Sequence, residues 1–228
     1  MQLLKDFFSL VYPPLCASCN TLLVRGECCI CTACEIRLPR TGFHMHPENA
    51  MTRIFWGRVP VEGATALFYY HKGGGVQSLI HQLKYLGRRD VGHRLGLLLG
   101  AELLSSPDFC GLEAIVPVPL HKKRLRQRGF NQSDVFAAGI SRATGIPLRA
   151  EALVRSKETQ TQTRKDRFRR WQNVSGVFEV RESALHGAGK LLLVDDVLTT
   201  GSTLEACTKQ LTNAINARIW IATIGFTP

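Results

Sequence analysis

The chain has 228 residues, of which 45% are apolar and 21% charged. This balance is that of a folded globular protein and excludes a disordered or collagen-like chain. No apolar run approaches the ~18 residues that a membrane-spanning helix needs, so we expect no membrane insertion. Lysine and arginine outnumber aspartate and glutamate by 29 to 18, and the net charge of +11 favours a polyanionic partner.

The chain begins with a short apolar stretch that includes Phe7 and runs into Pro13. No small-residue cleavage site follows this stretch, as a signal peptide would require. Leu15 also stands where a lipoprotein signal before Cys16 would have a small residue. We therefore expect a cytoplasmic protein.

Six of the eight cysteines lie between Cys16 and Cys34. Cys16 and Cys19 form one Cys-x-x-Cys pair, and Cys31 and Cys34 form a second pair after eleven intervening residues. Two such pairs supply the four thiolates of a tetrahedral zinc site, so we predict that these four residues bind a structural Zn²⁺. Disulfides or an iron–sulfur cluster are the weaker alternatives. Cys28 has the same spacing to Cys31 and could replace one ligand.

Residues 38–60 are rich in proline, histidine, arginine and glycine, which predicts an irregular connector. We interpret His44 and His46 in this segment as surface or packing residues, because the cysteines already complete a metal site. A domain boundary is predicted after residue 60. It separates an N-terminal zinc-binding module, residues 1–60, from a larger domain, residues 61–228.

The larger domain alternates predicted strands and helices. Strands are expected at 64–70, 114–118, 190–195 and 219–224, with shorter ones near 153 and at 177–180. Amphipathic helices are expected after the glycines at 73–75 and at 88–104, 131–144 and 203–215. Continuous apolar strands separated by helices predict an α/β fold, with a mostly parallel sheet and helices on both faces.

The strongest functional signal follows the strand at 190–195. Asp195 and Asp196 stand at its end, and the run Thr199-Thr200-Gly201-Ser202-Thr203 leads into the next helix. Small residues and a glycine allow backbone N–H groups at a helix start to surround one phosphate. Each carboxylate can accept a hydrogen bond from one of two neighbouring hydroxyls. Because α/β sheets bind ligands at the carboxyl ends of their strands, the pattern predicts a site for a phosphorylated ribose.

Other nucleotide-site patterns fit less well. A Walker loop needs a lysine between its last glycine and its Ser or Thr, and Gly201-Ser202-Thr203 has none. A dinucleotide-binding fold needs Gly-x-Gly-x-x-Gly after its first strand, and the chain lacks that run. A strand end without function is the remaining alternative.

Several motifs together resemble a known family. The run 194–203 resembles the loop of type I phosphoribosyltransferases that binds PRPP (phosphoribosyl pyrophosphate). The whole chain resembles the ComF family of competence proteins, which joins a four-cysteine finger to that fold. The motifs concerned are Cys31-Thr-Ala-Cys34, His81-Gln82-Leu83-Lys84-Tyr85, Val116-Pro117-Val118-Pro119-Leu120 and Arg128-Gly129-Phe130-Asn131-Gln132. The resemblance extends over nearly all of the chain, and the doubled Cys28-Cys29 departs from it.

The resemblance implies roles for the acid pair and the basic segments. Asp195 and Asp196 would be catalytic, residues 199–203 would bind the 5′-phosphate, and Mg²⁺ would be bound together with PRPP. The basic loop at 119–128 would bind pyrophosphate through Lys122, Lys123, Arg124 and Arg128. A flexible loop would close over the site through Thr163, Arg164, Lys165 and Arg167.

Three functions are compatible with these features. The first is a competence protein in which a PRPP-binding domain and a zinc finger handle single-stranded DNA, with the basic segments on its phosphates. The second is an active Mg²⁺-dependent phosphoribosyltransferase of nucleotide metabolism, with an unidentified acceptor. The third is a PRPP-sensing scaffold that docks other competence proteins. No residue pattern identifies an acceptor or shows that catalysis occurs.

Overall fold

The computed structural model describes residues 13–155 and 177–228. The strands are β1 (Gly63–Tyr69), β2 (Ala114–Pro117), β3 (Leu153–Arg155), β4 (Phe178–Val180), β5 (Lys190–Leu198) and β6 (Arg218–Phe226). The α-helices are α2 (Thr32–Arg37), α3 (Ala50–Arg53), α4 (Gly75–Tyr85), α5 (Arg89–Leu104), α6 (Lys122–Arg128), α7 (Gln132–Thr144) and α9 (Ser202–Ile215). Short 3₁₀ turns are η1 (Phe43–Met45), η2 (Pro107–Phe109) and η4 (Glu182–Leu185). None of the helices in these ranges has the length and apolar character needed to cross a bilayer.

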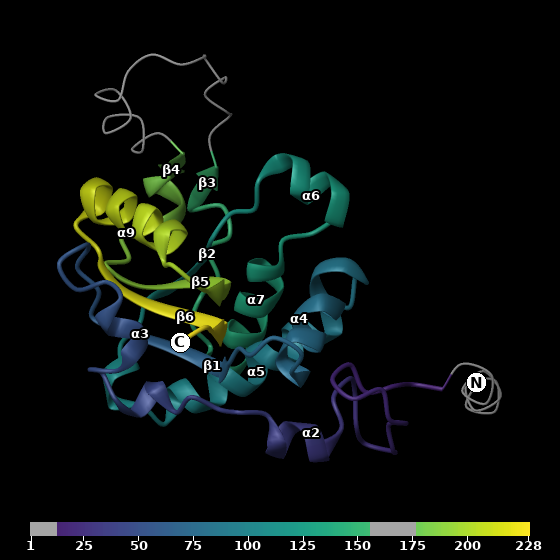
Figure 1. Cartoon of the computed structure of the whole chain (residues 1–228). Helices are drawn as coiled ribbons and strands as arrows, with labels where there is room; N and C mark the ends of the chain where they lie inside the picture. The colour runs from purple at the N-terminus through teal and green to yellow at the C-terminus, as the bar shows by residue number, and fades with distance from the viewer. Residues whose placement is uncertain (1–12, 156–176) are drawn as a thin grey trace, which may run out of the picture.

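Four parallel strands form the central sheet in the order β1–β6–β5–β2 (Figure 1). Leu193 of β5 pairs with Ile221 of β6 on one side and with Val116 of β2 on the other. Strands β3 and β4 form a separate antiparallel pair. The predicted α/β fold with a mostly parallel sheet is therefore confirmed. Because β5 is an inner strand, its carboxyl end lies at the middle of the sheet edge.

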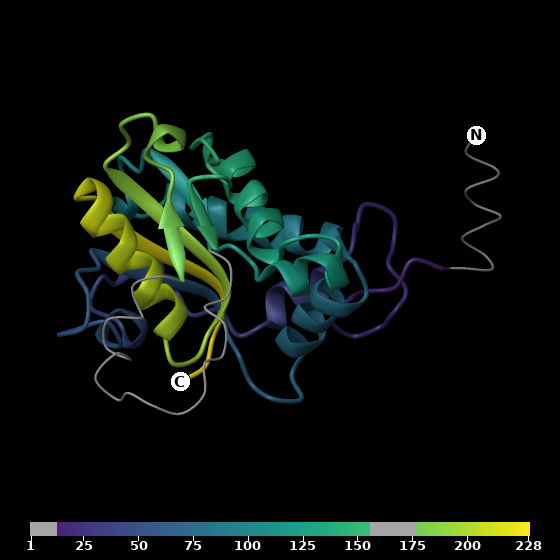
Figure 2. The same ribbon diagram turned by 90° about the horizontal axis from the view of Figure 1, so that it is seen from above.

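Helices cover both faces of the sheet (Figure 2). One face carries Leu191 and Leu193 and packs against α9, and the other carries Leu192 and Val194 and packs against α4, α5 and α7. Side chains alternate between the two faces of a strand, and here both faces are covered. This explains why β5 reads as a continuous apolar run.

Glycines bring α5 and α7 unusually close together. A Cβ atom at Gly96 would lie 2.1 Å from the carbonyl oxygen of Phe136, and one at Gly139 would lie 2.3 Å from that of His93. A larger side chain at either glycine would force the helices apart. The close packing fixes α7, whose first turn carries Ser133 to the acid pair.

The segment predicted to be an irregular connector contains short helical turns that pack on the sheet. Asn49 begins α3, because its Oδ1 accepts hydrogen bonds from the backbone N–H groups of Met51 and Thr52. Its Nδ2 donates to the carbonyl oxygen of Ala64 in β1. Met51 and Phe55 are fully buried in the core that includes α9. The segment thus has more regular structure than its composition suggested.

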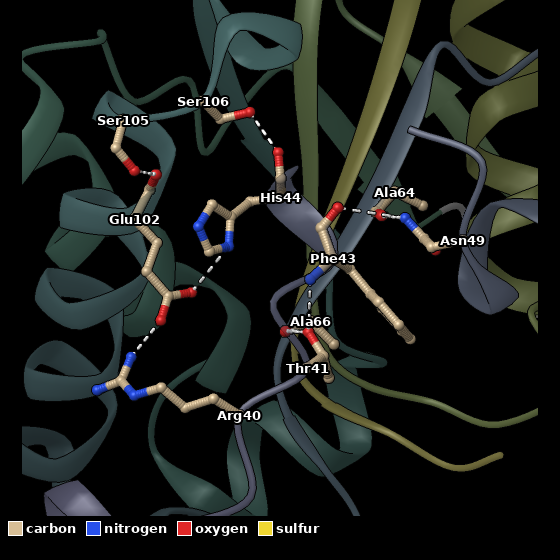
Figure 3. Close-up of polar contacts among 10 residues, drawn as sticks. All are labelled: Arg40, Thr41, Phe43, His44, Asn49, Ala64, Ala66, Glu102, Ser105 and Ser106. Carbon is tan, nitrogen blue, oxygen red and sulfur yellow. Dashed lines mark hydrogen bonds and ion pairs between the residues drawn. The ribbon is translucent and has the colours of Figure 1, made fainter. Parts of the chain in front are cut away.

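A carboxylate on α5 holds the start of the same segment (Figure 3). Glu102 pairs with Arg40, and its second oxygen lies 3.4 Å from Nδ1 of His44. The hydroxyl of Ser106 donates to the carbonyl oxygen of His44. His44 is therefore a packing residue, as the sequence predicted.

Candidate functional site

The acid pair lies within β5 rather than after it. The strand continues to Leu198, three residues beyond its predicted end at residue 195, because Asp195 and Leu198 still pair with Thr223 and Phe226 of the long strand β6. Pairing with a neighbour thus extended the strand beyond the point that hydrophobicity alone indicates. The two carboxylates are consequently held on regular backbone at the carboxyl end of the sheet.

The loop after β5 forms a small hollow at the start of α9. Gly201 has a φ of +77°, and a Cβ there would lie 3.2 Å from the side chains of Ile54 and Phe55, so the turn requires glycine. Asp195 and the predicted phosphate-binding residues line this hollow, whose volume is about 50 Å³; the latter are Thr199, Thr200, Gly201, Ser202 and Thr203. The first N–H groups of a helix have no partner within it, so they are available to an anion.

Asp195 is half-buried and is held by neutral donors. Its Oδ1 accepts hydrogen bonds from Oγ of Ser133, at 3.0 Å, and from the backbone N–H of Asp196, at 2.8 Å. Burial, together with the negative charge of Asp196, raises the pKa of Asp195 to about 7.

Asp196 has a different partner. Its Oδ2 lies 2.7 Å from Nζ of Lys84, which is in the last turn of α4. The ion pair gives the two neighbouring acids distinct environments, one beside a hydroxyl and one beside an ammonium group. Lys84 belongs to a motif that resembles the family, but sequence spacing gave no sign that it reaches the acid pair.

Sequence reasoning also missed Arg58, which braces the loop after β5. Its Nη1 donates to the carbonyl oxygen of Thr200 at 3.1 Å, and its Nη2 lies 2.5 Å from Oε2 of Glu205 in the first turn of α9. Lys209 and Arg58 together hold the pKa of Glu205 below its usual value. A lone arginine in a connector carries no sequence signal for this position.

The basic segment predicted to be a loop is in fact the helix α6. His121 caps its start, because Nδ1 accepts a hydrogen bond from the backbone N–H of Lys123 at 3.2 Å. Gly129, with a φ of +75°, ends it. Lysine, arginine, leucine and glutamine all favour helix, so the high charge of the segment did not prevent helix formation.

The predicted pyrophosphate-binding residues divide into two groups. Lys122, Lys123 and Arg124 are exposed on α6 and lie outside the lining of the hollow, which comes from β5, the loop and α9. The guanidinium of Arg128 lies over the ring of Tyr85, 5.3 Å from its centroid. Because Tyr85 follows Lys84, the end of α4 contacts both the basic helix and the acid pair.

The flexible-loop residues Thr163, Arg164, Lys165 and Arg167 lie outside the described residues.

The four predicted zinc ligands form one cluster. The sulfur atoms of Cys16, Cys19, Cys31 and Cys34 all lie within 4.8 Å of one another. Gly26, with a φ of +97°, makes the turn between the two pairs. Cys28 and Cys29 stand outside the cluster, the first exposed and the second buried in the apolar core. Four converging thiols fit a tetrahedral structural zinc site.

The cysteine module packs directly on α4 and α5. Glu35 of α2 accepts two hydrogen bonds from Arg94 of α5, at 2.7 and 2.8 Å. A Cβ atom at Gly75, the first residue of α4, would lie 2.4 Å from Oγ of Ser18. A cavity of about 320 Å³ lies at this junction, between Ala17 and Asn20 on one side and the first turns of α4 on the other.

Comparison with known proteins places this chain among competence-related proteins. It is 31% identical over 223 residues to the DNA utilization protein YhgH of Escherichia coli K12, covering 92% of this chain and 97% of that protein. It is 40% identical over 100 residues to competence protein F of Haemophilus influenzae, covering 43% and 44% of the two chains. No family model matches. A solved structure of glutamine PRPP amidotransferase from B. subtilis aligns with a TM-score of 0.44 and 19% identity, over 63% of this chain and 30% of that one.

Proposed function

The chain belongs to the ComF family, and we propose that its larger domain binds PRPP or a related ribose phosphate in a protein that handles single-stranded DNA. One observation carries the ribose-phosphate part of this proposal. Asp195 and the small-residue loop line the same hollow at the carboxyl end of an inner parallel strand. Acceptors for hydroxyls therefore adjoin donors for a phosphate.

The chain's own residues would divide the work of binding. N–H groups and hydroxyls of residues 199–203 would hold the 5′-phosphate, and this would fix the position of the sugar. Asp195 and Asp196 would accept hydrogen bonds from the two ribose hydroxyls and favour positive charge at the anomeric carbon. Mg²⁺ arriving with the diphosphate would neutralise it and make it a better leaving group.

The surface of α6 supports a role with nucleic acid. Its exposed cations suit sequence-independent binding to the phosphates of a single strand. These cations are Lys122, Lys123, Arg124 and Arg126. Tyr85 is 63% exposed and lies beside this helix, where its ring could stack on a base. The names of the relatives, a DNA utilization protein and a competence protein, agree with such a surface.

We also infer that the four-cysteine cluster holds a structural Zn²⁺. Cys16 and Cys31 are buried in the core that the module shares with α4 and α5, so the metal would stabilise the packing of the module on the larger domain. Its four sulfur ligands would leave no open coordination position, and the metal would have no catalytic role.

Titration of the protein with PRPP tests the site, by calorimetry with and without Mg²⁺. The double variant Asp195→Asn, Asp196→Asn should lose binding, whereas Asp108→Asn, a carboxylate of η2 away from the site, should bind as the wild type does. Equal affinity in the double variant and the wild type would remove the acid pair from the site. Release of pyrophosphate on addition of a nucleobase would identify a transferase, and binding without turnover would identify a PRPP-sensing scaffold.

A further inference from the structure

The motif His81–Tyr85 contains a lysine that reaches the acid pair. Nζ of Lys84 lies 2.7 Å from Oδ2 of Asp196, and the two side chains are 21% and 17% exposed. Water and salt screen such a partly buried pair less than they screen a surface pair. Removing one partner would therefore leave a poorly compensated charge on the other.

The two acids depend on this ammonium group in different ways. Asp196 contacts it directly through one oxygen, Oδ2. Asp195 is held by the neutral hydroxyl of Ser133 and by a backbone N–H. Burial and the charge of Asp196 raise the pKa of Asp195 to about 7, and the charge of Lys84 acts in the opposite direction.

The other helix that faces Asp195 contributes no cation at this point. Cys207 of α9 is a buried thiol whose pKa is raised well above its usual value by burial and by the charge of Asp195, while Arg155 of β3 lowers it. Cys207 therefore remains neutral near pH 7. Among residues 13–155 and 177–228, the cation that the structure places against the acid pair is Lys84.

We propose that Lys84 is a positioning residue of this site, whose ammonium group fixes the Asp196 carboxylate and favours the ionised form of the acid pair, in which both acids can accept hydrogen bonds from a ligand diol. The proposal rests on the ribose-phosphate site proposed above. Without Lys84, Asp195 would keep its proton to a higher pH, because no ammonium group would offset the negative charge of Asp196. A protonated oxygen donates instead of accepting, so the diol would lose an acceptor.

Three variants isolate the charge of Lys84. Lys84→Gln removes it, Lys84→Arg keeps it, and Lys72→Gln removes an exposed lysine from the turn before α4 as a matched control. Asp196→Asn gives an independent check that does not require Lys84 to change. It removes the charge of Asp196, which raises the pKa of Asp195, and leaves that of Lys84, so Asp195 should titrate at a lower pH than in the wild type.

The experiment follows the aspartate carboxyl carbons of the ligand-free protein by isotope-edited NMR between about pH 5 and about pH 9. In the wild type, Asp195 should titrate with a midpoint of about 7. We expect a midpoint about one pH unit higher in Lys84→Gln, and a midpoint close to that of the wild type in Lys84→Arg and Lys72→Gln. An unchanged midpoint in Lys84→Gln, or in Asp196→Asn, overturns the proposal.

Calorimetry with Mg²⁺ and PRPP then connects the charge to binding. A shift of one pH unit makes the affinity of Lys84→Gln about fivefold weaker at pH ~7 and nearly normal at pH ~9. An equal loss at both pH values would indicate a purely structural role and overturn the proposal. If the midpoint shifts in Lys84→Gln but the wild-type protein binds no PRPP, the ribose-phosphate site is refuted. The action of Lys84 on the acid pair is then still supported.

Discussion

Arg58 and Thr200 lie 142 residues apart in the chain, and Nη1 of Arg58 donates a hydrogen bond to the carbonyl oxygen of Thr200 at 3.1 Å. The same guanidinium pairs with Glu205 at the start of α9. One side chain thus joins the segment after α3 both to the loop after β5 and to the first turn of α9. Its hydrogen bond also occupies a carbonyl oxygen whose partial negative charge would otherwise oppose an anion.

Arg58→Gln should weaken PRPP binding about three- to tenfold while the protein stays folded, because the loop loses its brace and the site loses a nearby positive charge. Calorimetry gives the affinity, and circular dichroism reports the fold. Arg53→Gln is the matched control, since Arg53 lies over Trp56 in the same segment, 5.7 Å from its ring centroid. If both variants lost affinity equally, general charge rather than the contact with Thr200 would be responsible.

Cys16→Ser should abolish stoichiometric zinc binding and lower the melting temperature by about 5 °C or more, because Cys16 is fully buried in the core shared with α4 and α5. Cys28→Ser should retain zinc, because Cys28 is exposed and stands outside the cluster. Metal analysis by mass spectrometry measures the stoichiometry of each. Zinc retained by Cys16→Ser but lost from Cys28→Ser would show that the ligand set is wrong.

The features that could be predicted from the sequence are those whose residues lie close together along the chain. The cysteine ligands all lie within residues 16–34, and the acids and small residues of the candidate site lie within residues 195–203. The alternation of apolar strands with helices indicates the sheet. The contacts of Lys84 and Arg58 could not be predicted in this way. They join residues far apart in the chain, and only the packing of α4 and of the connector against β5 and its loop brings them together.

Local composition misled the prediction in two places. Charge suggested a loop at α6, although its residues favour helix and His121 and Gly129 supply the caps. The prolines, glycines and histidines of residues 38–60 concealed Met51 and Phe55, which are fully buried. In both places a few residues, which cap a helix or enter the core, determine the structure. The average composition of a segment does not reveal such residues.

Asp195→Asn should raise the free energy of unfolding at pH ~8 by roughly 1 to 3 kcal/mol. The pKa of Asp195 is raised in the folded state to about 7 from an ordinary value of 3.8, so the folded protein binds more protons than the unfolded chain between these values. Wild-type stability therefore falls as the pH rises through this window. Asparagine does not titrate, so its advantage should be small near pH ~4, grow toward pH ~7 and then level off.

Urea denaturation of the wild type and of Asp195→Asn, carried out across this pH range, measures that difference directly. Ser133→Ala is the companion variant. It removes a hydrogen bond that lowers the pKa of Asp195 but leaves the acid able to titrate, so stability should still fall as the pH rises, over a window that extends to slightly higher pH than in the wild type. If the stability difference between Asp195→Asn and the wild type stays constant with pH, ionisation of Asp195 does not destabilise the folded protein.

Replacing exposed cations of α6 should weaken binding to single-stranded DNA mainly through the phosphates. For Lys123→Gln with Arg124→Gln, we expect lower affinity and a shallower dependence of log affinity on log salt, by about 0.7 for each phosphate that the variant no longer neutralises. Arg142→Gln, an exposed arginine in the last turn of α7, should leave both quantities unchanged. Tyr85→Ala should lower affinity without changing the salt dependence, because stacking releases no counterions. Fluorescence anisotropy with a labelled single strand at several salt concentrations measures both, and equal slopes for the α6 double variant and the wild type would place the DNA on another surface.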